Sequence, residues 1–150
     1  MNPPKALGDG LATIRLSRPL EWMDTDAAKM WHYTAAFRHV EFAELELHAR
    51  LGIAEHTFGR TPRVNVTADF LAPARFGDVL TTTLQVAQVG RSSITCTWTL
   101  ATGEETVATG KIVAAMIGPN GQTITIPDVV RAALEHGGDA SGSGASWERG

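Results

Sequence analysis

The sequence predicts an α+β fold in which a strongly curved antiparallel sheet wraps around one long central helix. Two patterns carry this prediction: a helix-like run from about residue 33 to 52, and several long strands with alternating polarity separated by short turns. Strands joined by short turns pair antiparallel, and a helix that is apolar on most of its surface has to be buried. Because 150 residues suffice for one sizeable core, we expect a single domain over residues 1–136.

The central helix is predicted from two apolar stripes. One stripe contains Ala36, Val40, Ala43, Leu47 and Leu51, and the other contains Phe42, Leu45 and Ala49. Gly52 is the expected end of this helix, because glycine adopts the left-handed conformation that often closes a helix.

The strands are predicted from alternation with period two. The first, residues 12–22, is interrupted near Pro19, which suits an edge strand or a bulge. The others span residues 64–70, 79–90, 93–100 and 107–118. A short second helix is expected over 127–136, with Pro127 before or at its first turn.

Composition limits the classes of function. The 13 Lys and Arg against 16 Asp and Glu leave no basic surplus, so we expect neither nucleic acid nor a membrane as a partner. The single cysteine, Cys96, excludes an intramolecular disulfide and thiolate-rich zinc sites, and its alternation with Trp98 indicates a core position. We expect no metal and no cofactor. No run reaches the roughly 20 apolar residues of a membrane span, and the N-terminus lacks an apolar signal region, so a cytoplasmic location is expected.

Residues 137–150, GGDASGSGASWERG, predict a disordered tail because they offer little apolar surface to bury. Trp147 within this tail is interpreted as exposed.

Two aspartates precede the central helix in the stretch EWMDTDAAKMWHYTAAF, residues 21–37. Asp24 and Asp26 lie between a strand and a helix, beside several aromatic residues. From the local sequence alone, the simplest interpretation of either aspartate is a turn former or a helix cap. Its surroundings leave a catalytic role open.

Four features in this order resemble the hotdog-fold acyl-CoA thioesterases, specifically the 4-hydroxybenzoyl-CoA thioesterase-like family. They are DTDAA after the first strand, Glu41 in the helical run, DFLAPARFGDVL at 69–80, and VGRSSITCTW at 89–98. The resemblance covers about residues 12–117. It implies that two subunits pair edge to edge, as a homodimer or homotetramer, with active sites at the dimer interface.

The resemblance also implies individual roles. The family's catalytic carboxylate falls on Asp26, and its oxyanion-binding backbone N–H falls on Tyr33. The sequence departs from the family pattern at Lys29, where glycine is usual, and at Ala35 and Ala36, where a small polar residue and a tyrosine are common. Glycine permits a positive φ at little cost and lysine does not, while the alanines would enlarge the pocket or make it less polar.

A carboxylate beside a helix N-terminus suits thioester hydrolysis. The carboxylate can attack the carbonyl or take a proton from water, and the unpaired N–H groups of the first helical turn can bind the oxyanion. One such donor is typically worth about 3 to 4 kcal/mol. We therefore interpret Asp26 as the nucleophile or general base and Asp24 as a brace that shapes the loop.

Two further residues are reserve catalysts. Glu41 on the central helix could supply the carboxylate, although a salt bridge with Arg38 is the simpler interpretation. His32 could act as a base, although a packed, hydrogen-bonded histidine is the commoner case. The other histidines show no spacing typical of a metal site.

Coenzyme A carries phosphates that an acidic chain must meet locally. Arg75 and Arg91 lie in connections and are predicted to bind them, with hydroxyl groups from Ser92 and Ser93. The alternative is that both arginines are solvated turn residues. Trp31 is predicted to form part of the substrate pocket.

Three functions remain open at this point. The favoured one is hydrolysis of an acyl-CoA or acyl-carrier thioester. A second is hydration or dehydration of an enoyl thioester, although Asp26 and His32 lack the glycine-rich setting typical of hotdog hydratases. A third is a non-catalytic acyl-CoA-binding domain, for which Lys29 is the main reason.

Overall fold

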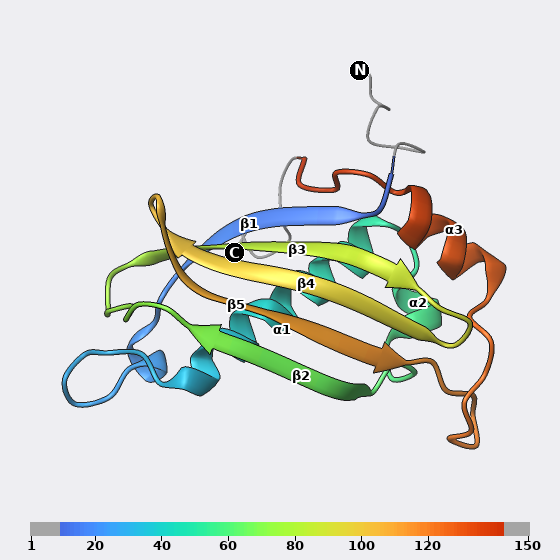
Figure 1. The fold of residues 1–150 in the computed structure, drawn as a ribbon, viewed down its shortest axis with the longest axis horizontal. Helices are drawn as coiled ribbons and strands as arrows, with labels where there is room; N and C mark the ends of the chain where they lie inside the picture. The colour runs from blue at the N-terminus through green and yellow to red at the C-terminus, as the bar shows by residue number, and fades with distance from the viewer. Residues whose placement is uncertain (1–9, 143–150) are drawn as a thin grey trace.

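The computed structural model describes residues 10–142, and five antiparallel strands in it form one sheet with the order β1-β3-β4-β5-β2 (Figure 1). The strands are β1 Thr13–Pro19, β2 Arg63–Phe70, β3 Val79–Val89, β4 Ser93–Thr102 and β5 Glu105–Ala115. The sheet curves over the long helix α1, Tyr33–Arg50, so the predicted α+β hotdog fold is confirmed.

The predicted helices are both present. Helix α1 ends before Gly52, whose φ of 76° supplies the expected left-handed residue. Helix α3, Asp128–His136, follows Pro127 as predicted. The single-turn helices η2, Trp22–Asp24, and α2, Ala54–Thr57, are too short to produce a periodic pattern and were missed. None of the helices within residues 10–142 is long and apolar enough to cross a bilayer.

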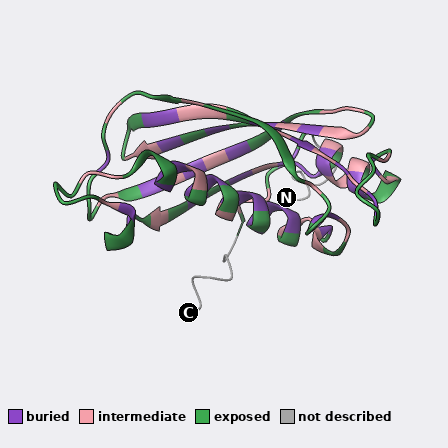
Figure 2. Ribbon diagram, turned by 90° about the horizontal axis from the view of Figure 1, so that it is seen from below, coloured by how far each residue is buried: buried purple, intermediate pink, exposed green. Residues whose placement is uncertain are grey.

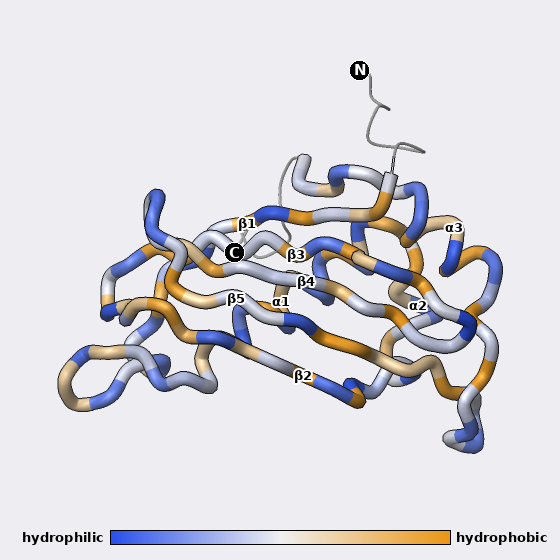
Figure 3. Tube along the Cα trace, in the orientation of Figure 1, coloured by the Kyte–Doolittle hydropathy of each residue, from blue (hydrophilic) through white to orange (hydrophobic). Residues whose placement is uncertain are grey.

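The core lies between α1 and the concave face of the sheet. One stripe of the helix, including Ala36, Val40 and Leu47, is fully buried there with the strand residues Leu84 and Trp98. Alternation along the strands places threonines on the opposite face, and Figure 3 shows the resulting change of hydropathy from residue to residue. Cys96 is buried, and this burial raises the pKa of its thiol to about 12, so its predicted core role is confirmed.

The second apolar stripe of α1 is not covered within one chain. Leu45 is 42% exposed and Ala49 is also exposed. Figure 2 shows that the side of α1 that faces away from the sheet carries exposed residues. The prediction that α1 is buried around most of its circumference is therefore wrong for the single chain.

The two edges of the sheet differ. At the β1 edge, the Thr13 N–H donates to the Gly138 carbonyl over 2.9 Å and the Ala140 N–H donates to the Thr13 carbonyl over 2.7 Å. The ordered chain therefore extends at least to Gly142, beyond the predicted boundary at residue 136, while Trp147 lies outside the described residues. The β2 edge pairs with no other described strand.

The first strand ends earlier than predicted. Strand β1 stops at Pro19 and not at residue 22, because proline has no N–H and the chain then turns into η2. Its position at the edge of the sheet agrees with the interpretation of Pro19.

Candidate active site

The segment that connects β1 to α1 is a tight, hairpin-like loop. Thr25 and Trp31 form an antiparallel bridge, and the Asp26 N–H donates to the Met30 carbonyl over 2.8 Å. The loop is also bonded to the segment between β2 and β3, where the Trp31 N–H donates to the Ala74 carbonyl over 2.9 Å. This arrangement presents Asp26 near the tip of an ordered loop.

Asp26 is exposed, and one of its oxygens is held by the loop. Oδ1 accepts the Ala28 N–H at 2.8 Å and the Met30 N–H at 3.1 Å. The other oxygen accepts no hydrogen bond from residues 10–142. The carboxylate is thus fixed in orientation while one oxygen faces solvent.

Lys29 lies in the same loop with a φ of 65°, and it is the one non-glycine residue with positive φ in the described chain. The backbone therefore adopts the conformation that glycine would favour at this position, and the lysine carries the steric cost. The departure from the family's glycine does not abolish the turn.

Asp24, in contrast, is buried, with 3% of its surface exposed. Its Oδ2 accepts the Glu21 N–H at 2.9 Å, and its Oδ1 forms an ion pair with the Arg38 guanidinium. Its predicted role as a brace agrees with these bonds. Arg38 is therefore paired with Asp24, and the interpretation that it pairs with Glu41 is not supported by any ion pair in the described chain.

The N-terminus of α1 offers unpaired donors. Neither the Tyr33 N–H nor the Thr34 N–H has an acceptor among the described residues, and the N-cap residue His32 supplies no side-chain cap. The His32 side chain is exposed. A helix N-terminus in this state combines free donors with the positive end of the helix dipole.

An open hollow of about 500 Å³ lies beside this helix end. Its walls are formed by Trp31, Tyr33, Phe70, Leu71, Ala72 and Pro73. The Trp31 and Phe70 rings meet edge to face with centroids 5.9 Å apart, and the Tyr33 and Phe70 rings lie 6.4 Å apart. The structure thus brings predicted Trp31 and Tyr33 together with the end of β2, which was not predicted to line the site.

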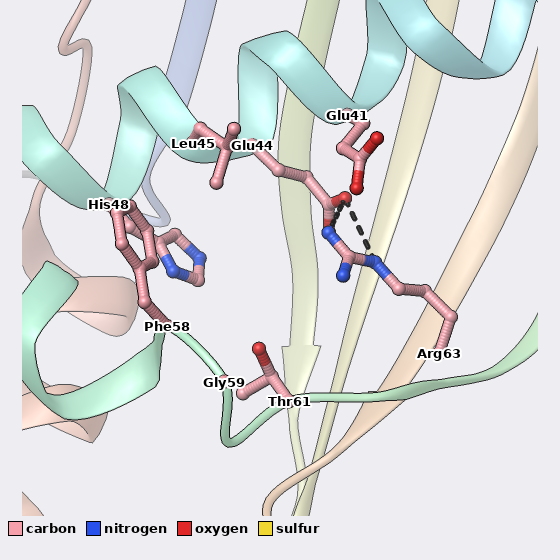
Figure 4. Close-up of a pocket in the computed structure, with 8 residues that line it drawn as sticks. All are labelled: Glu41, Glu44, Leu45, His48, Phe58, Gly59, Thr61 and Arg63. Carbon is pink, nitrogen blue, oxygen red and sulfur yellow. Dashed lines mark hydrogen bonds and ion pairs between the residues drawn. The ribbon is translucent and has the colours of Figure 1, made fainter.

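Glu41 lies further along α1, on the exposed side of the helix. It lines a cavity of about 300 Å³ together with Glu44, Leu45, His48, Phe58, Gly59, Thr61 and Arg63 (Figure 4). A neighbouring cavity of about 410 Å³ shares Glu41, Glu44 and Arg63 and extends between α1 and β2 to Val66 and Ile112.

Two polar pairs in this region were missed by sequence reasoning. The Arg63 Nε donates to Glu44 Oε1 over 3.2 Å, and His48 Nδ1 lies 2.7 Å from the Thr57 hydroxyl. Burial raises the pKa of Glu44 despite the bond from Arg63. Burial, and then the positive charge of Arg63, lowers the pKa of His48 to about 4. No local signal could have revealed these pairs, because their members are distant in sequence.

The predicted phosphate-binding residues lie at opposite ends of the sheet. Arg75 lies next to the loop that carries Asp26, where it forms an antiparallel backbone bridge with Met30. Arg91 and Ser92 lie in the β3–β4 turn at the other end, beside α3, and Ser93 is the first residue of β4 (Figure 1). One chain therefore does not bring Arg91 to Asp26.

Residues 10–142 contain no cluster of three His, Cys, Asp or Glu side chains that could hold a metal ion.

Comparison with known proteins agrees with this geometry. The family model of the thioesterase superfamily matches residues 40–109, a little under half of the chain. No curated protein matches the chain by sequence.

Several solved structures share the fold. The 1,4-dihydroxy-2-naphthoyl-CoA thioesterase from Synechocystis has a TM-score of 0.70 and 23% identity, over 81% of this chain and 95% of that one. A thioesterase from Thermus thermophilus, complexed with coenzyme A and Zn, has a TM-score of 0.75 and 19% identity, over 84% of this chain and 93% of that one. The BH1999 gentisyl-coenzyme A thioesterase has a TM-score of 0.72 and 20% identity, over 80% of this chain and 98% of that one.

At these identities the solved structures establish the shared fold, and the family model adds the sequence relationship. Residues 40–109 match the thioesterase superfamily model and the chain shares the hotdog fold of these thioesterases, which supports the predicted family and, with it, thioester hydrolysis as the general chemistry.

Proposed function

We propose that this protein hydrolyses an acyl-CoA thioester, with Asp26 as nucleophile or general base and the Tyr33 N–H as oxyanion donor. The observation that carries the proposal is the position of an exposed carboxylate, fixed through one oxygen, on the loop that leads into a helix N-terminus with unpaired N–H groups. The aromatic hollow at this helix end supports an apolar acyl group, including an aromatic one.

The reaction adds water across the C–S bond and yields a carboxylate and a free thiol. Either the free Asp26 oxygen attacks the carbonyl carbon, to give an anhydride that water then cleaves, or it takes a proton from the attacking water. In both routes negative charge develops on the carbonyl oxygen, where the Tyr33 N–H stabilises it. In the first route the departing thiolate takes a proton from solvent, and in the second it takes the proton that Asp26 removed from the water. Exposed His32 lies at the same helix end and is the reserve proton donor.

We also propose that the active unit is a homodimer formed through β2. The inner face of this strand carries apolar side chains that are open to solvent, including Val64 at 62%, Val66 at 45% and Phe70 at 43% exposure. Since the β1 edge is occupied by residues 137–142, β2 is the sheet edge that a second copy can extend. The uncovered stripe of α1 around Leu45 adjoins this edge.

Antiparallel pairing of two β2 strands places the two ends of the strand beside each other. With full overlap, Phe70 of one subunit lies opposite the partner subunit's Arg63. The hollow beside Phe70 then meets the region around the partner subunit's Glu41. Glu41 could thus act as the reserve carboxylate across the interface.

The same symmetry bears on coenzyme A. Pairing through β2 turns the partner sheet around, so that the partner subunit's Arg91, Ser92 and Ser93 lie at the same end as Arg75. We propose that Arg75 and this turn bind the phosphates from two subunits.

The test is thiol release from a panel of aromatic, short-chain and long-chain acyl-CoAs by wild type and Asp26→Asn. We expect one class to be turned over, with kcat lowered about 100- to 10,000-fold in the near-isosteric variant. Asp69→Asn is the matched control, because Asp69 is an exposed aspartate on the outer face of β2. It should retain wild-type kcat.

Each alternative has its own outcome. Wild-type rates in Asp26→Asn would make Asp26 a loop brace and Glu41→Gln the next variant. Coenzyme A binding without turnover would favour the non-catalytic domain, and addition of water to an enoyl-CoA would favour the hydratase.

The dimer is tested by Val66→Lys, which places a charge on the apolar face of β2. Sedimentation should show a folded monomer, and turnover should be lost with it if the site spans the interface. An active monomer would refute the shared site while leaving the role of Asp26 intact.

A further inference from the structure

Asp24 is a buried ionisable group that the proposed reaction does not use. It is 3% exposed, although Trp22 and Met23 of the same η2 turn are 60% and 66% exposed. A buried carboxylate requires hydrogen-bonded or charged partners, because its desolvation is otherwise very unfavourable. A chain that keeps this group in an otherwise exposed turn must gain something from the contacts it makes.

Those contacts reach three parts of the site. The Asp24 carboxylate accepts the Glu21 N–H at the start of the loop and pairs with Arg38 in the second turn of α1. Its Oδ2 also lies 3.7 Å from the His39 Nε2 on the same helix. At the end of the loop, the His32 N–H donates to the Asp24 backbone carbonyl over 2.8 Å.

The Asp24 contacts and the other hydrogen bonds of the loop join it to different elements. The bonds from the Trp31 N–H to the Ala74 carbonyl and from the Phe76 N–H to the Lys29 carbonyl fasten the loop to the connection that follows β2. The Asp24 side chain fastens it to α1. The Arg38 Nη1 also lies 3.5 Å from the Met23 sulfur, but the Asp24 carboxylate supplies the ion pair between this turn and α1.

We propose that Asp24 is a positioning residue. It holds the 25–31 loop against α1 so that Asp26 and the Tyr33 N–H can both reach the carbonyl group of the thioester substrate. This inference rests on the proposed function. Displacement of a catalytic group by about 1 Å can cost roughly 100-fold in rate. The ion pair thus acts on turnover through Asp26, without contact with the substrate.

The first variant is Asp24→Asn, which preserves the shape of the side chain and an acceptor for the Glu21 N–H. It removes the charge that binds Arg38, and its amide group brings a donor towards the guanidinium and His39. We expect kcat for the preferred acyl-CoA to fall about 10- to 100-fold. KM should stay within about threefold, because the aromatic hollow is unchanged.

Arg38 provides the rescue comparison. Arg38→Lys keeps a positive charge opposite Asp24 and should retain more of kcat than Arg38→Gln, which removes the guanidinium from the buried carboxylate. If residue 38 served only for side-chain packing, Arg38→Lys and Arg38→Gln should have similar kcat.

Val130→Ala separates positioning from stability. Val130 is fully buried in α3, at the opposite end of the sheet from η2 (Figure 1). This substitution should lower the melting temperature while kcat, measured well below that temperature, stays at the wild-type value. If Asp24→Asn retains kcat, or raises KM alone, the positioning role is refuted.

Amide hydrogen exchange gives a readout that does not depend on activity. In Asp24→Asn the Ala28, Met30 and His32 amides should exchange faster than in wild type, and Val130→Ala should leave them unchanged. Unchanged exchange in Asp24→Asn would overturn the inference. Failure of the proposed function is distinguishable, because it appears as wild-type turnover in Asp26→Asn or as absence of thiol release by wild type.

Discussion

His48 provides a prediction about stability that follows from one buried group. The ring lies beside the Thr57 hydroxyl in the cavity under α1, and burial together with Arg63 lowers its pKa to about 4. In the unfolded chain the pKa returns to an ordinary value of about 6.5. The unfolded state therefore binds a proton below pH 6.5 that the folded state does not bind, and stability is lost as the pH falls from there towards 4.

The size of the loss follows from the two pKa values. Each unit of difference corresponds to about 1.4 kcal/mol, so the full effect is roughly 3 kcal/mol once the pH is below 4. Between pH 7.5 and pH 5 the expected loss from this residue is about 2 kcal/mol. His39, whose pKa is lowered mainly by burial, adds a loss of the same sign, whereas Glu44, whose pKa is raised by burial, acts in the opposite direction.

The assay is urea unfolding followed by the fluorescence of buried Trp98, at pH 7.5 and pH 5 and at one protein concentration. His48→Gln removes the titration and keeps an amide that can reach Thr57. Its free energy of unfolding should fall by about 2 kcal/mol less than that of wild type between the two pH values. His56→Gln, on the partly exposed α2 helix, is the control. An equal pH dependence in wild type and His48→Gln would refute the reasoning.

Two further predictions concern the loop and the covered edge. Lys29→Gly should stabilise the fold by about 0.5 to 1 kcal/mol in the same unfolding assay. The substitution removes the cost of positive φ, about 1 to 2 kcal/mol, but glycine offsets part of this gain because it has more conformational freedom in the unfolded chain. Lys29→Ala, which keeps the cost, should leave stability nearly unchanged, and a stabilisation equal to that of glycine would contradict the strain. Truncation after His136 should lower the free energy of unfolding by roughly 2 to 4 kcal/mol, because it removes the hydrogen bonds of residues 137–142 to β1 and Arg50. It should also promote association of chains through the uncovered β1 edge of the sheet. Truncation after Gly142 keeps those bonds and should behave as the full chain.

The sequence predicts the parts of this fold that depend on local periodicity. The extent of α1, the three long strands β3, β4 and β5, and the helix after Pro127 all follow from the spacing of apolar residues. The order of strands around β2 and the placement of residues 137–142 along β1 depend on contacts between distant segments, for which periodicity gives no signal. Composition predicts a disordered tail from residue 137, yet Gly138 and Ala140 are held by backbone hydrogen bonds that do not depend on the type of side chain.

The candidate site shows the same division. The order of the motifs pointed to Asp26 and Tyr33, and the structure places both on one loop and helix start. The different burial of Asp24 and Asp26 could not be read from the sequence, because two aspartates separated by one residue have nearly identical local surroundings. In the structure the two aspartates differ because Arg38 and His39 of α1, which are distant from Asp24 in the sequence, contact its carboxylate.

Strand β2 connects the apolar surface that one chain leaves exposed with the candidate active site. The exposed apolar face of this strand and the uncovered stripe of α1 meet at the cavities lined by Glu41 and Arg63, and Phe70 at the other end of the strand borders the aromatic hollow. A two-fold axis at the middle of β2 would exchange these ends, and it would cover the apolar surface in the same step. In the proposed dimer, the symmetry that would bury the second stripe of α1 would also bring the partner subunit's Glu41 towards the helix N-terminus. On this argument, loss of the dimer and loss of turnover should occur together in variants of the inner face of β2.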